Sequence, residues 1–233
     1  MKAPNELPEE VLTQTDRAYQ SLRAAIVRCD YEPGARLRVD ELTQKLAISS
    51  SPLREALSRL AGQGLVQVLE NRGFRVAPLS IDGVVDLTRV RILIESETLT
   101  DAMEHGNDAW ESEVVAAAHR LALAEQRFNG ASLILDDDWS GRHRAFHMAL
   151  YSGARSPLLK SMVSELFDAA ERYRRYSASH RKSKRNKNDE HQQLMRATLS
   201  RSKKVALDLL RQHISSTERN VTAAFLAANG KNA

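Results

Sequence analysis

The amino-acid sequence predicts a mainly α-helical chain of two domains. Its 233 residues allow one or two domains at about 100–200 residues each. Apolar residues recur at helical spacing along most of the chain, whereas strand-like residues gather only near residues 66–76. A proline, Pro78, follows that stretch. These observations divide the chain into an N-terminal domain of residues 1–78 and a C-terminal helical domain of residues 79–233.

The composition excludes several broad classes of protein. With 42% hydrophobic and 27% charged residues, the chain is neither collagen-like nor largely disordered. Cys29 is the one cysteine, so no disulfide can form within the chain, and no signal-peptide pattern opens the sequence. No run of apolar residues approaches the 18 that a membrane span needs. We therefore expect a cytoplasmic protein that does not cross a membrane.

The N-terminal domain is predicted to contain three helices and a β-hairpin. Helical spacing of apolar residues runs from Thr15 to Arg28 and again from Asp40 to Ala47. A third helix follows Ser49-Ser50-Ser51-Pro52, where a serine cap precedes proline at the first helical position. The segments Val66–Leu69 and Phe74–Val76 read as two strands joined by a turn. This order of elements predicts a winged helix-turn-helix.

The third helix has an outer face suited to phosphates and base edges. With Leu53, Leu57 and Leu60 turned inward, Arg54 and Arg59 are exposed, and the helix N-terminus offers unpaired backbone amides. The alternative is a small helical domain whose arginines are merely solvated. Charge does not decide between the two, because residues 1–80 hold 11 basic and 10 acidic side chains.

Several segments of this domain resemble the DNA-binding domain of GntR-type transcriptional regulators. They are Pro33-Gly34-Ala35-Arg36-Leu37, Glu41-Leu42, Ile48 to Leu57, Gly64-Leu65-Val66 and Arg72-Gly73-Phe74-Arg75-Val76. The resemblance implies that double-stranded operator DNA is the partner and that the wing tip approaches the minor groove. Ser50 stands where the family usually has a DNA-contacting arginine. The expected DNA-binding residues are Arg36, Ser49, Ser50, Ser51, Arg54, Arg59, Arg72 and Gly73.

The C-terminal domain is predicted to be an all-α antiparallel helical bundle. Its six helices are expected near residues 82–105, 108–129, 137–153, 156–178, 188–200 and 202–228. Arg91-Ile92-Leu93-Ile94-Glu95, Phe146-His147 and Glu190-His191 resemble the FCD effector domain of the FadR branch of the family.

Four histidines fall where an interior metal site could form. His143 and His147 lie one helical turn apart on the third bundle helix, and His191 and His213 lie on the inward faces of two others. From spacing alone, hydrogen-bonded core histidines remain an alternative. The resemblance to FCD domains implies a metal held by an aspartate and three histidines, with His143 replacing the aspartate here. Nitrogen-only ligation favours Zn²⁺ or Ni²⁺ as the cofactor.

The resemblance also assigns Arg91 to the binding of a small carboxylate effector. Its alternative is an exposed ion pair with Glu95, four residues along the same helix. Because neutral imidazoles leave the ion with its full charge, an anionic effector should bind more strongly than in an aspartate-containing site.

Two charged stretches admit more than one interpretation. Asp136-Asp137-Asp138 could supply a general base, but the interpretation that we favour is that it interacts with the N-terminal dipole of the third bundle helix. Between Arg172 and Lys187 there are eight basic residues and no acidic one, which predicts a solvated loop or, alternatively, a contact with DNA backbone or an acidic partner. His105, His119 and His180 are assigned to surface or packing.

Together these features predict a ligand-responsive, DNA-binding transcriptional regulator rather than an enzyme. We expect a homodimer, because operators read by one helix per subunit need two half-sites. The alternative is a metal-dependent enzyme with an accessory nucleic-acid-binding domain. A scaffold that binds neither DNA nor ligand is a third possibility.

Overall fold

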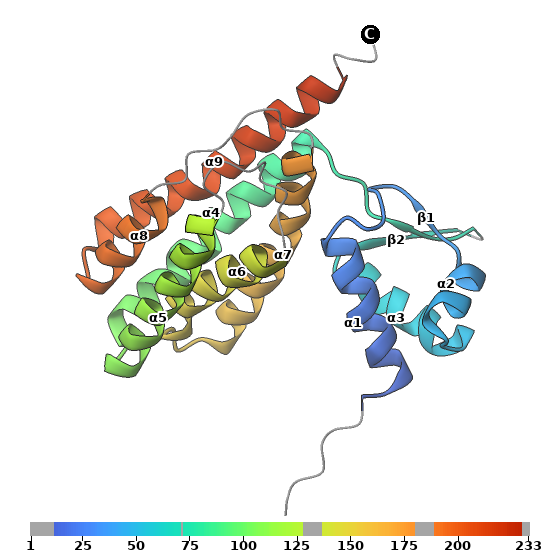
Figure 1. The fold of residues 1–233 in the computed structure, drawn as a ribbon, viewed down its shortest axis with the longest axis horizontal. Coiled ribbons are helices and arrows are strands. Elements are labelled where there is room, and N and C mark those ends of the chain that lie inside the picture. The colour runs from blue at the N-terminus through green and yellow to red at the C-terminus, as the bar shows by residue number, and fades with distance from the viewer. Residues whose placement is uncertain (1–11, 71, 128–136, 180–188, 230–233) are drawn as a thin grey trace, which may run out of the picture. The chain divides into compact units, whose positions relative to one another are not determined.

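A computed structural model gives the fold of the chain and describes residues 12–70, 72–127, 137–179 and 189–229 (Figure 1). The chain divides into two compact units, Met1–Pro78 and Leu79–Ala233. The fold is mainly α-helical, as the sequence predicts, with a small sheet in the first unit. Among the described residues, no helix is both long and apolar enough to cross a membrane.

The first unit is a winged helix-turn-helix. Its elements are α1 (Gln14–Val27), β1 (Arg36–Leu37), α2 (Val39–Leu46), α3 (Ser50–Gly62), β2 (Val66–Leu69) and β3 (Gly73–Val76). The three strands are antiparallel in the order β1-β3-β2. Leu22 and Ile26 of α1 pack with Leu53, Leu57 and Leu60 of α3 in one core, all of them almost fully buried. This core fixes which face of α3 reaches the surface.

Two details of this unit correct the sequence prediction. The sheet has a third strand, β1, because Arg36 and Leu37 pair with Arg75 and Phe74 of β3. Pro52 occupies the third position of α3 rather than the first, and Ser49 is the N-cap residue without a side-chain capping bond. The hydroxyl of Ser49 therefore does not occupy the backbone amides in the first turn of α3, and these amides can bind other partners.

The second unit is the predicted helical bundle. It comprises α4 (Ile81–His105), α5 (Asp108–Arg127), α6 (Asp137–Ser152), α7 (Pro157–Ser179), α8 (Glu190–Leu199) and α9 (Lys203–Asn229). Predicted and observed ends differ by one residue at most wherever both fall among the described residues. Local hydrogen bonds fix such helix ends: at the start of α4 the hydroxyl oxygen of Ser80 accepts a hydrogen bond from the backbone amide of Gly83.

Large apolar side chains fill the interior of the bundle. α4 packs along α9 and α7, α5 along α6, and α8 against α9 (Figure 1). Trp110 donates its indole hydrogen to the carbonyl of Ala149 at 2.9 Å, which ties α5 to α6. Phe146, Leu150 and Leu210 are fully buried in the same cluster. This packing brings the inward faces of α6, α8 and α9 together.

Candidate functional site

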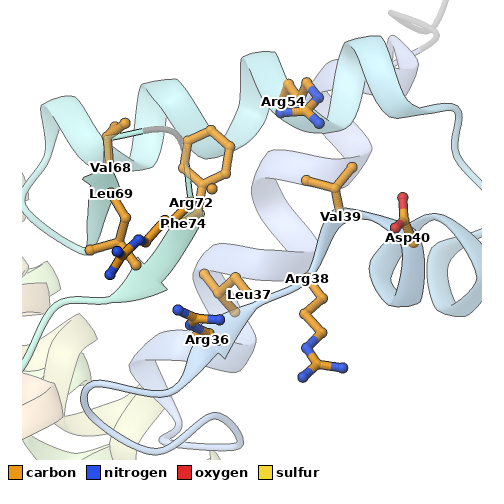
Figure 2. A pocket seen from close by; sticks show the side chains of 11 residues that line it. Arg36, Leu37, Arg38, Val39, Asp40, Arg54, Val68, Leu69, Arg72 and Phe74 are labelled. Atoms are coloured by element: carbon orange, nitrogen blue, oxygen red, sulfur yellow. The ribbon is translucent and has the colours of Figure 1, made fainter.

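A groove of about 560 Å³ opens on the first unit between the wing, the start of α2 and α3 (Figure 2). Four arginines line it: Arg36 of β1, Arg38 before α2, Arg54 of α3 and Arg72 at the wing. Arg38 forms a surface ion pair with Glu41 at 3.2 Å. No described residue accepts a hydrogen bond from the other three arginines, so their donors face the groove or solvent.

The other predicted DNA-binding residues take different places. Gly73 lines the groove, and its φ of 88° is one that glycine adopts without strain. The serines at positions 49, 50 and 51 are exposed where α3 begins. Arg59 is not among the groove residues. Its guanidinium pairs with Asp16 of α1 at 2.9 Å and lies 4.3 Å from the ring centroid of Tyr19.

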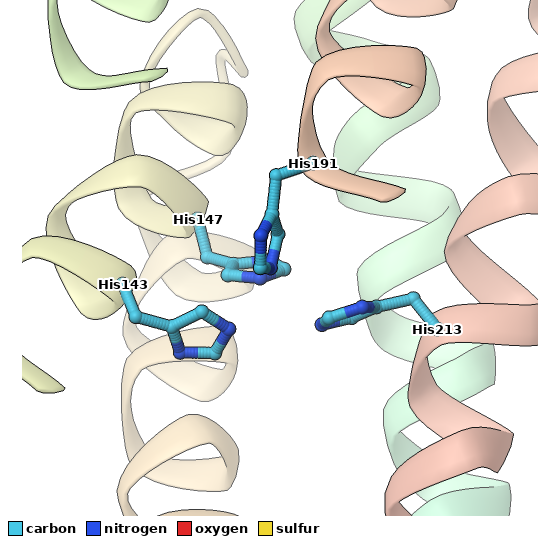
Figure 3. Close-up of side chains that lie close together, drawn as sticks. All are labelled: His143, His147, His191 and His213. Atoms are coloured by element: carbon cyan, nitrogen blue, oxygen red, sulfur yellow. The ribbon is translucent and has the colours of Figure 1, made fainter. Parts of the chain in front are cut away.

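The four predicted histidines meet inside the second unit (Figure 3). Each offers one ring nitrogen, and these four atoms lie within 4.8 Å of one another. His143 and His147 come from α6, His191 from α8 and His213 from α9, with side chains between 0% and 9% exposed. In a tetrahedral site with metal–nitrogen bonds of ~2.1 Å, ligand nitrogens stand about 3.4 Å apart. The most widely separated of these nitrogens therefore need to approach each other by up to about 1.4 Å to hold one ion.

Two of the rings are oriented by carboxylates. Nδ1 of His191 lies 3.0 Å from Oε1 of Glu125 on α5, and Nδ1 of His213 lies 3.2 Å from Oε2 of Glu190 on α8. A carboxylate beside Nδ1 favours the tautomer with hydrogen on that atom, so Nε2 carries the lone pair. Metal-ligating histidines are ordinarily held by such carboxylates, which also make the imidazole a better ligand.

His147 provides the clearest sign that the cluster is built to receive a group. It is fully buried, and neither ring nitrogen has a hydrogen-bond partner in the described part of the chain. Burial, reinforced by neighbouring His213, His191, Arg91 and Arg174, lowers the pKa of His147 well below its usual value. The ring is therefore neutral, the form that binds a metal. A buried imidazole of this kind normally has a partner, and a metal would supply one.

His143 has different neighbours. Its ring stacks on Trp139 at a centroid distance of 4.6 Å, and its Nδ1 is hydrogen-bonded by Nη1 of Arg174 on α7. Burial lowers the pKa of Arg174 to about 10, so its guanidinium still carries a charge at neutral pH. His143 thus joins the other three histidines in space but faces a cation rather than a carboxylate.

Arg91 lies in the interior of the same unit and pairs with a residue of its own helix, α4. Its Nε donates to Oε1 of Glu95 at 2.6 Å, and Oε2 of Glu95 accepts a hydrogen bond from Tyr151 at 2.6 Å. The ion pair considered from the sequence does form, but both partners are buried rather than exposed. Burial and the adjacent Glu95 raise the pKa of Tyr151 well above its usual value, so its hydroxyl stays a donor.

The basic stretch is not wholly a solvated loop, as the sequence had suggested. Arg172, Arg174 and Arg175 belong to α7, and their side chains are buried or nearly so. Arg174 and Arg175 both pair with Glu171, and Arg175 also reaches Asp137. The part of the stretch from residue 180 to residue 187, which includes His180, lies outside the described residues.

The remaining predicted residues have ordinary local roles. Asp137 and Asp138 lie in the first turn of α6, and Asp138 pairs with Arg142, while Asp136 is outside the described ranges. His105 pairs with Asp101 at 2.7 Å, and His119 is exposed.

Sequence reasoning overlooked three residues of the histidine site. Glu190 directly precedes His191 in the sequence, and this position could have marked it as a residue of the site. Arg174 lies two helical turns after Phe167 and therefore on the same face of its helix, which could have indicated an inward side chain. Its place within a run of basic residues suggested a solvated loop instead. Glu125 carries no local signal, because only the packing of α5 beside α8 brings it to His191.

Comparisons with known proteins agree with both halves of the fold. Residues 14–76 match the family of bacterial regulatory proteins called the gntR family, and residues 86–216 match the FCD domain. The HTH-type transcriptional repressor GlaR of Escherichia coli K12 is 38% identical over 84% of this chain and 90% of its own length. The uncharacterized HTH-type transcriptional regulator BphR of Paraburkholderia xenovorans LB400 is 37% identical over 87% of this chain and 82% of its own.

A solved structure shows the same fold. Escherichia coli McbR/YncC superposes with a TM-score of 0.73 at 20% identity, covering 93% of this chain and 99% of that one. GlaR and BphR are both described as HTH-type transcriptional regulators, which removes the alternative of a metal-dependent enzyme. The chain therefore belongs to the GntR family of DNA-binding transcriptional regulators, in the FadR-like group whose winged helix is followed by an FCD domain.

Proposed function

We propose that the chain is a ligand-responsive regulator in which residues 1–78 read operator DNA and residues 79–233 bind a metal and a small carboxylate effector. The observation that carries the second part is the convergence of four buried histidines around His147, whose nitrogens lack partners among the described residues. A protein that binds operator DNA works in the cytoplasm of a bacterium, and we place this one there.

The groove of the first unit is the proposed DNA contact. Arg36, Arg54 and Arg72 have donors available for phosphates and base edges, and the exposed serines add hydroxyls where α3 begins. α3 would enter the major groove, with Arg72 and Gly73 at the wing approaching the minor groove. Arg38 joins this set because it lines the same groove.

We expect Arg54→Gln to weaken binding of a duplex selected from a random library by about tenfold or more. If Arg54 contacts a base, the variant lowers the affinity but leaves its dependence on salt unchanged. If Arg54 contacts a phosphate, the slope of log affinity against log salt concentration also becomes smaller by about one. Arg59→Gln is the matched control on the same helix. Because Arg59 pairs with Asp16, it should change affinity by no more than about twofold. Unchanged binding by Arg54→Gln, measured by fluorescence anisotropy, would rule out the groove as the reading surface.

In the second unit, His143, His147, His191 and His213 would hold a transition metal. Four imidazoles suit Zn²⁺ or Ni²⁺ and disfavour Mg²⁺, Ca²⁺ and Mn²⁺, which prefer oxygen ligands. Glu125 and Glu190 would orient two of the ligands. When bound, the metal supplies a positive centre for an anion, and Arg91 lies in the same interior to pair with a carboxylate.

A thermal-shift screen tests the effector site. Small carboxylates should raise the melting temperature of the metal-loaded protein and leave the chelated protein unchanged. At a hundredfold excess over Kd, binding adds about 2.7 kcal/mol to the free energy of unfolding. Equal shifts with and without metal would show that the metal does not take part. The effector can alter DNA binding only if it has different affinities for DNA-competent and incompetent states.

We also propose that the protein is a homodimer formed through its helical unit. Val85 and Leu93 of α4 are 46% and 63% exposed, and their spacing of eight residues puts them on one face of the helix. Large exposed apolar side chains on one helix face commonly mark an interaction surface. Two copies would present two winged helices to the two half-sites of an operator.

A further inference from the structure

Among the described residues that line the groove of the first unit, one acid stands with the four arginines. This acid is Asp40, which lies in the first turn of α2 and has an exposed side chain (Figure 2). Val39 and Leu42 of the same helix are buried in the core of the unit, three residues apart on one face. Because these two side chains hold α2 against the core, Asp40 is left on its outer face.

The carboxylate of Asp40 has no hydrogen-bond or ion-pair partner in the described part of the chain. The hydroxyl of Thr43 donates to the backbone carbonyl of Asp40 at 2.7 Å and does not occupy the carboxylate. The next residue, Glu41, differs, because it pairs with Arg38 at 3.2 Å and does not line the groove. The dipole of α2 would account for both acids, since both lie in the first turn, but not for the position of one of them in the groove.

A carboxylate restricts what a DNA-binding groove can accept. It repels phosphates and only accepts hydrogen bonds, so its partner on DNA must be a donor. In the major groove, the base edges offer two amino donors, N4 of cytosine and N6 of adenine. Adenine has the acceptor N7 beside N6, and guanine and thymine present no donor there. Cytosine is therefore the base that a carboxylate suits best.

Arg54 of α3 lines the same groove and has the opposite requirement. A guanidinium donates to O6 and N7 of guanine, the two acceptors that a carboxylate would meet unfavourably. α2 and α3 pack against each other in one core, so their exposed side chains in this groove face the same stretch of duplex. The two residues together therefore distinguish a donor on one base from acceptors on another.

We propose that Asp40 is a specificity-determining residue that accepts a hydrogen bond from N4 of a cytosine in each operator half-site. This inference rests on the proposed reading of DNA by the groove and adds an acidic base contact to its arginines. Asp40 acts largely by excluding other sequences. A carboxylate that faces O6, N7 or O4 of another base is left unpaired beside an acceptor, which weakens binding of that sequence.

The test begins with selection of duplexes from a random library by the full chain, followed by fluorescence anisotropy with each of the four base pairs at each position. At one cytosine of each half-site, the wild-type chain should bind about fivefold or more tighter than with any other base. Asp40→Asn should move the preference at that position from cytosine to adenine, because an amide side chain bonds to N6 and N7 of adenine. Asp40→Ala should abolish the preference there and keep those at the other positions.

Glu41→Gln is the matched control, because it removes one negative charge from the same turn of α2 outside the groove. It disrupts only the surface ion pair with Arg38, a kind of interaction that contributes little. This variant and both Asp40 variants should bind random-sequence duplex somewhat more tightly, since each removes a negative charge near the phosphates. Only the Asp40 variants should change a base preference. A residue that merely stabilises the start of α2 would leave every base preference unchanged.

The outcomes separate this inference from the function on which it depends. If the wild-type chain selects no preferred sequence, or if Arg54→Gln selects the same sequence with the same affinity, the groove does not read DNA and the inference fails with it. If the selected operator depends on Arg54 but both Asp40 variants keep every base preference of the wild-type chain, Asp40 does not read a base. A change at a position where the wild-type chain prefers a base other than cytosine would also contradict the proposal.

Discussion

Replacing His147 by alanine is expected to weaken binding of Zn²⁺ or Ni²⁺ by at least about a hundredfold. Loss of a residue that merely orients a ligand costs about 10- to 100-fold, so loss of a ligand should cost no less. His147 is fully buried at the centre of the cluster, with ring centroids of His143, His191 and His213 between 4.6 and 5.8 Å away. Competition with a chromophoric chelator gives the affinity directly.

Two further variants keep that experiment specific. His147→Gln retains most of the side-chain volume, so a loss of metal binding there reflects ligation rather than packing. His119→Ala removes an exposed histidine from α5, outside the cluster, and should leave metal binding unchanged. Wild-type affinity in His147→Ala would mean that the four histidines are core residues without a ligand.

Glu95→Ala is expected to lower the free energy of unfolding by about 3–5 kcal/mol. The substitution leaves the guanidinium of Arg91, 4% exposed, as a buried charge without its carboxylate. For a helical unit of this size the loss corresponds to a fall in melting temperature on the order of 10 °C. Chemical denaturation of the metal-free protein measures the free energy without interference from ligand binding.

The controls for Glu95 separate a buried charge from a lost hydrogen bond. Tyr151→Phe removes only the hydroxyl that donates to Glu95 and should cost about 1 kcal/mol. In the double variant Arg91→Met with Glu95→Leu no charge remains, so most of the stability should return. A cost below about 1 kcal/mol for Glu95→Ala would show that Arg91 finds water or another partner.

Local signals explain how much of the fold the sequence could predict. Helix ends depend on nearby residues, such as the serine that caps α4, and the amphipathic spacing of α1 and α3 identifies their buried faces. Strand β1 was missed because it is two residues long and is defined by pairing with β3, a contact distant in sequence. Pairing of that kind leaves no periodic pattern to read.

The histidine site likewise contains residues that local spacing could predict and residues that only the packing of the bundle reveals. Spacing put His143 and His147 on one face of α6, and the helix assignments placed His191 and His213 on inward faces. The neighbours that decide the chemistry of these rings come from other helices. Glu125 reaches His191 from α5, and Arg174 reaches His143 from α7, so neither contact could be deduced without the packing of the bundle.

The resemblance to FCD domains implies an aspartate where this chain has His143, and the difference would give a metal site here its own electrostatic character. Among the described residues the candidate ligands are four imidazoles and no carboxylate, so they would leave a bound metal with its full charge, and the buried side chains of Arg91 and Arg174 lie beside them. A metal bound there would therefore favour an anion as a further ligand. We therefore expect removal of the metal to weaken effector binding more here than in a site with an aspartate ligand.

Metal analysis of the wild-type chain, purified without a histidine tag, tests the metal centre most directly. One equivalent of Zn²⁺ or Ni²⁺ per chain, removed by chelation and restored by adding the ion, is the predicted result. A chain that carries no stoichiometric transition metal and takes none up from solution would contradict it.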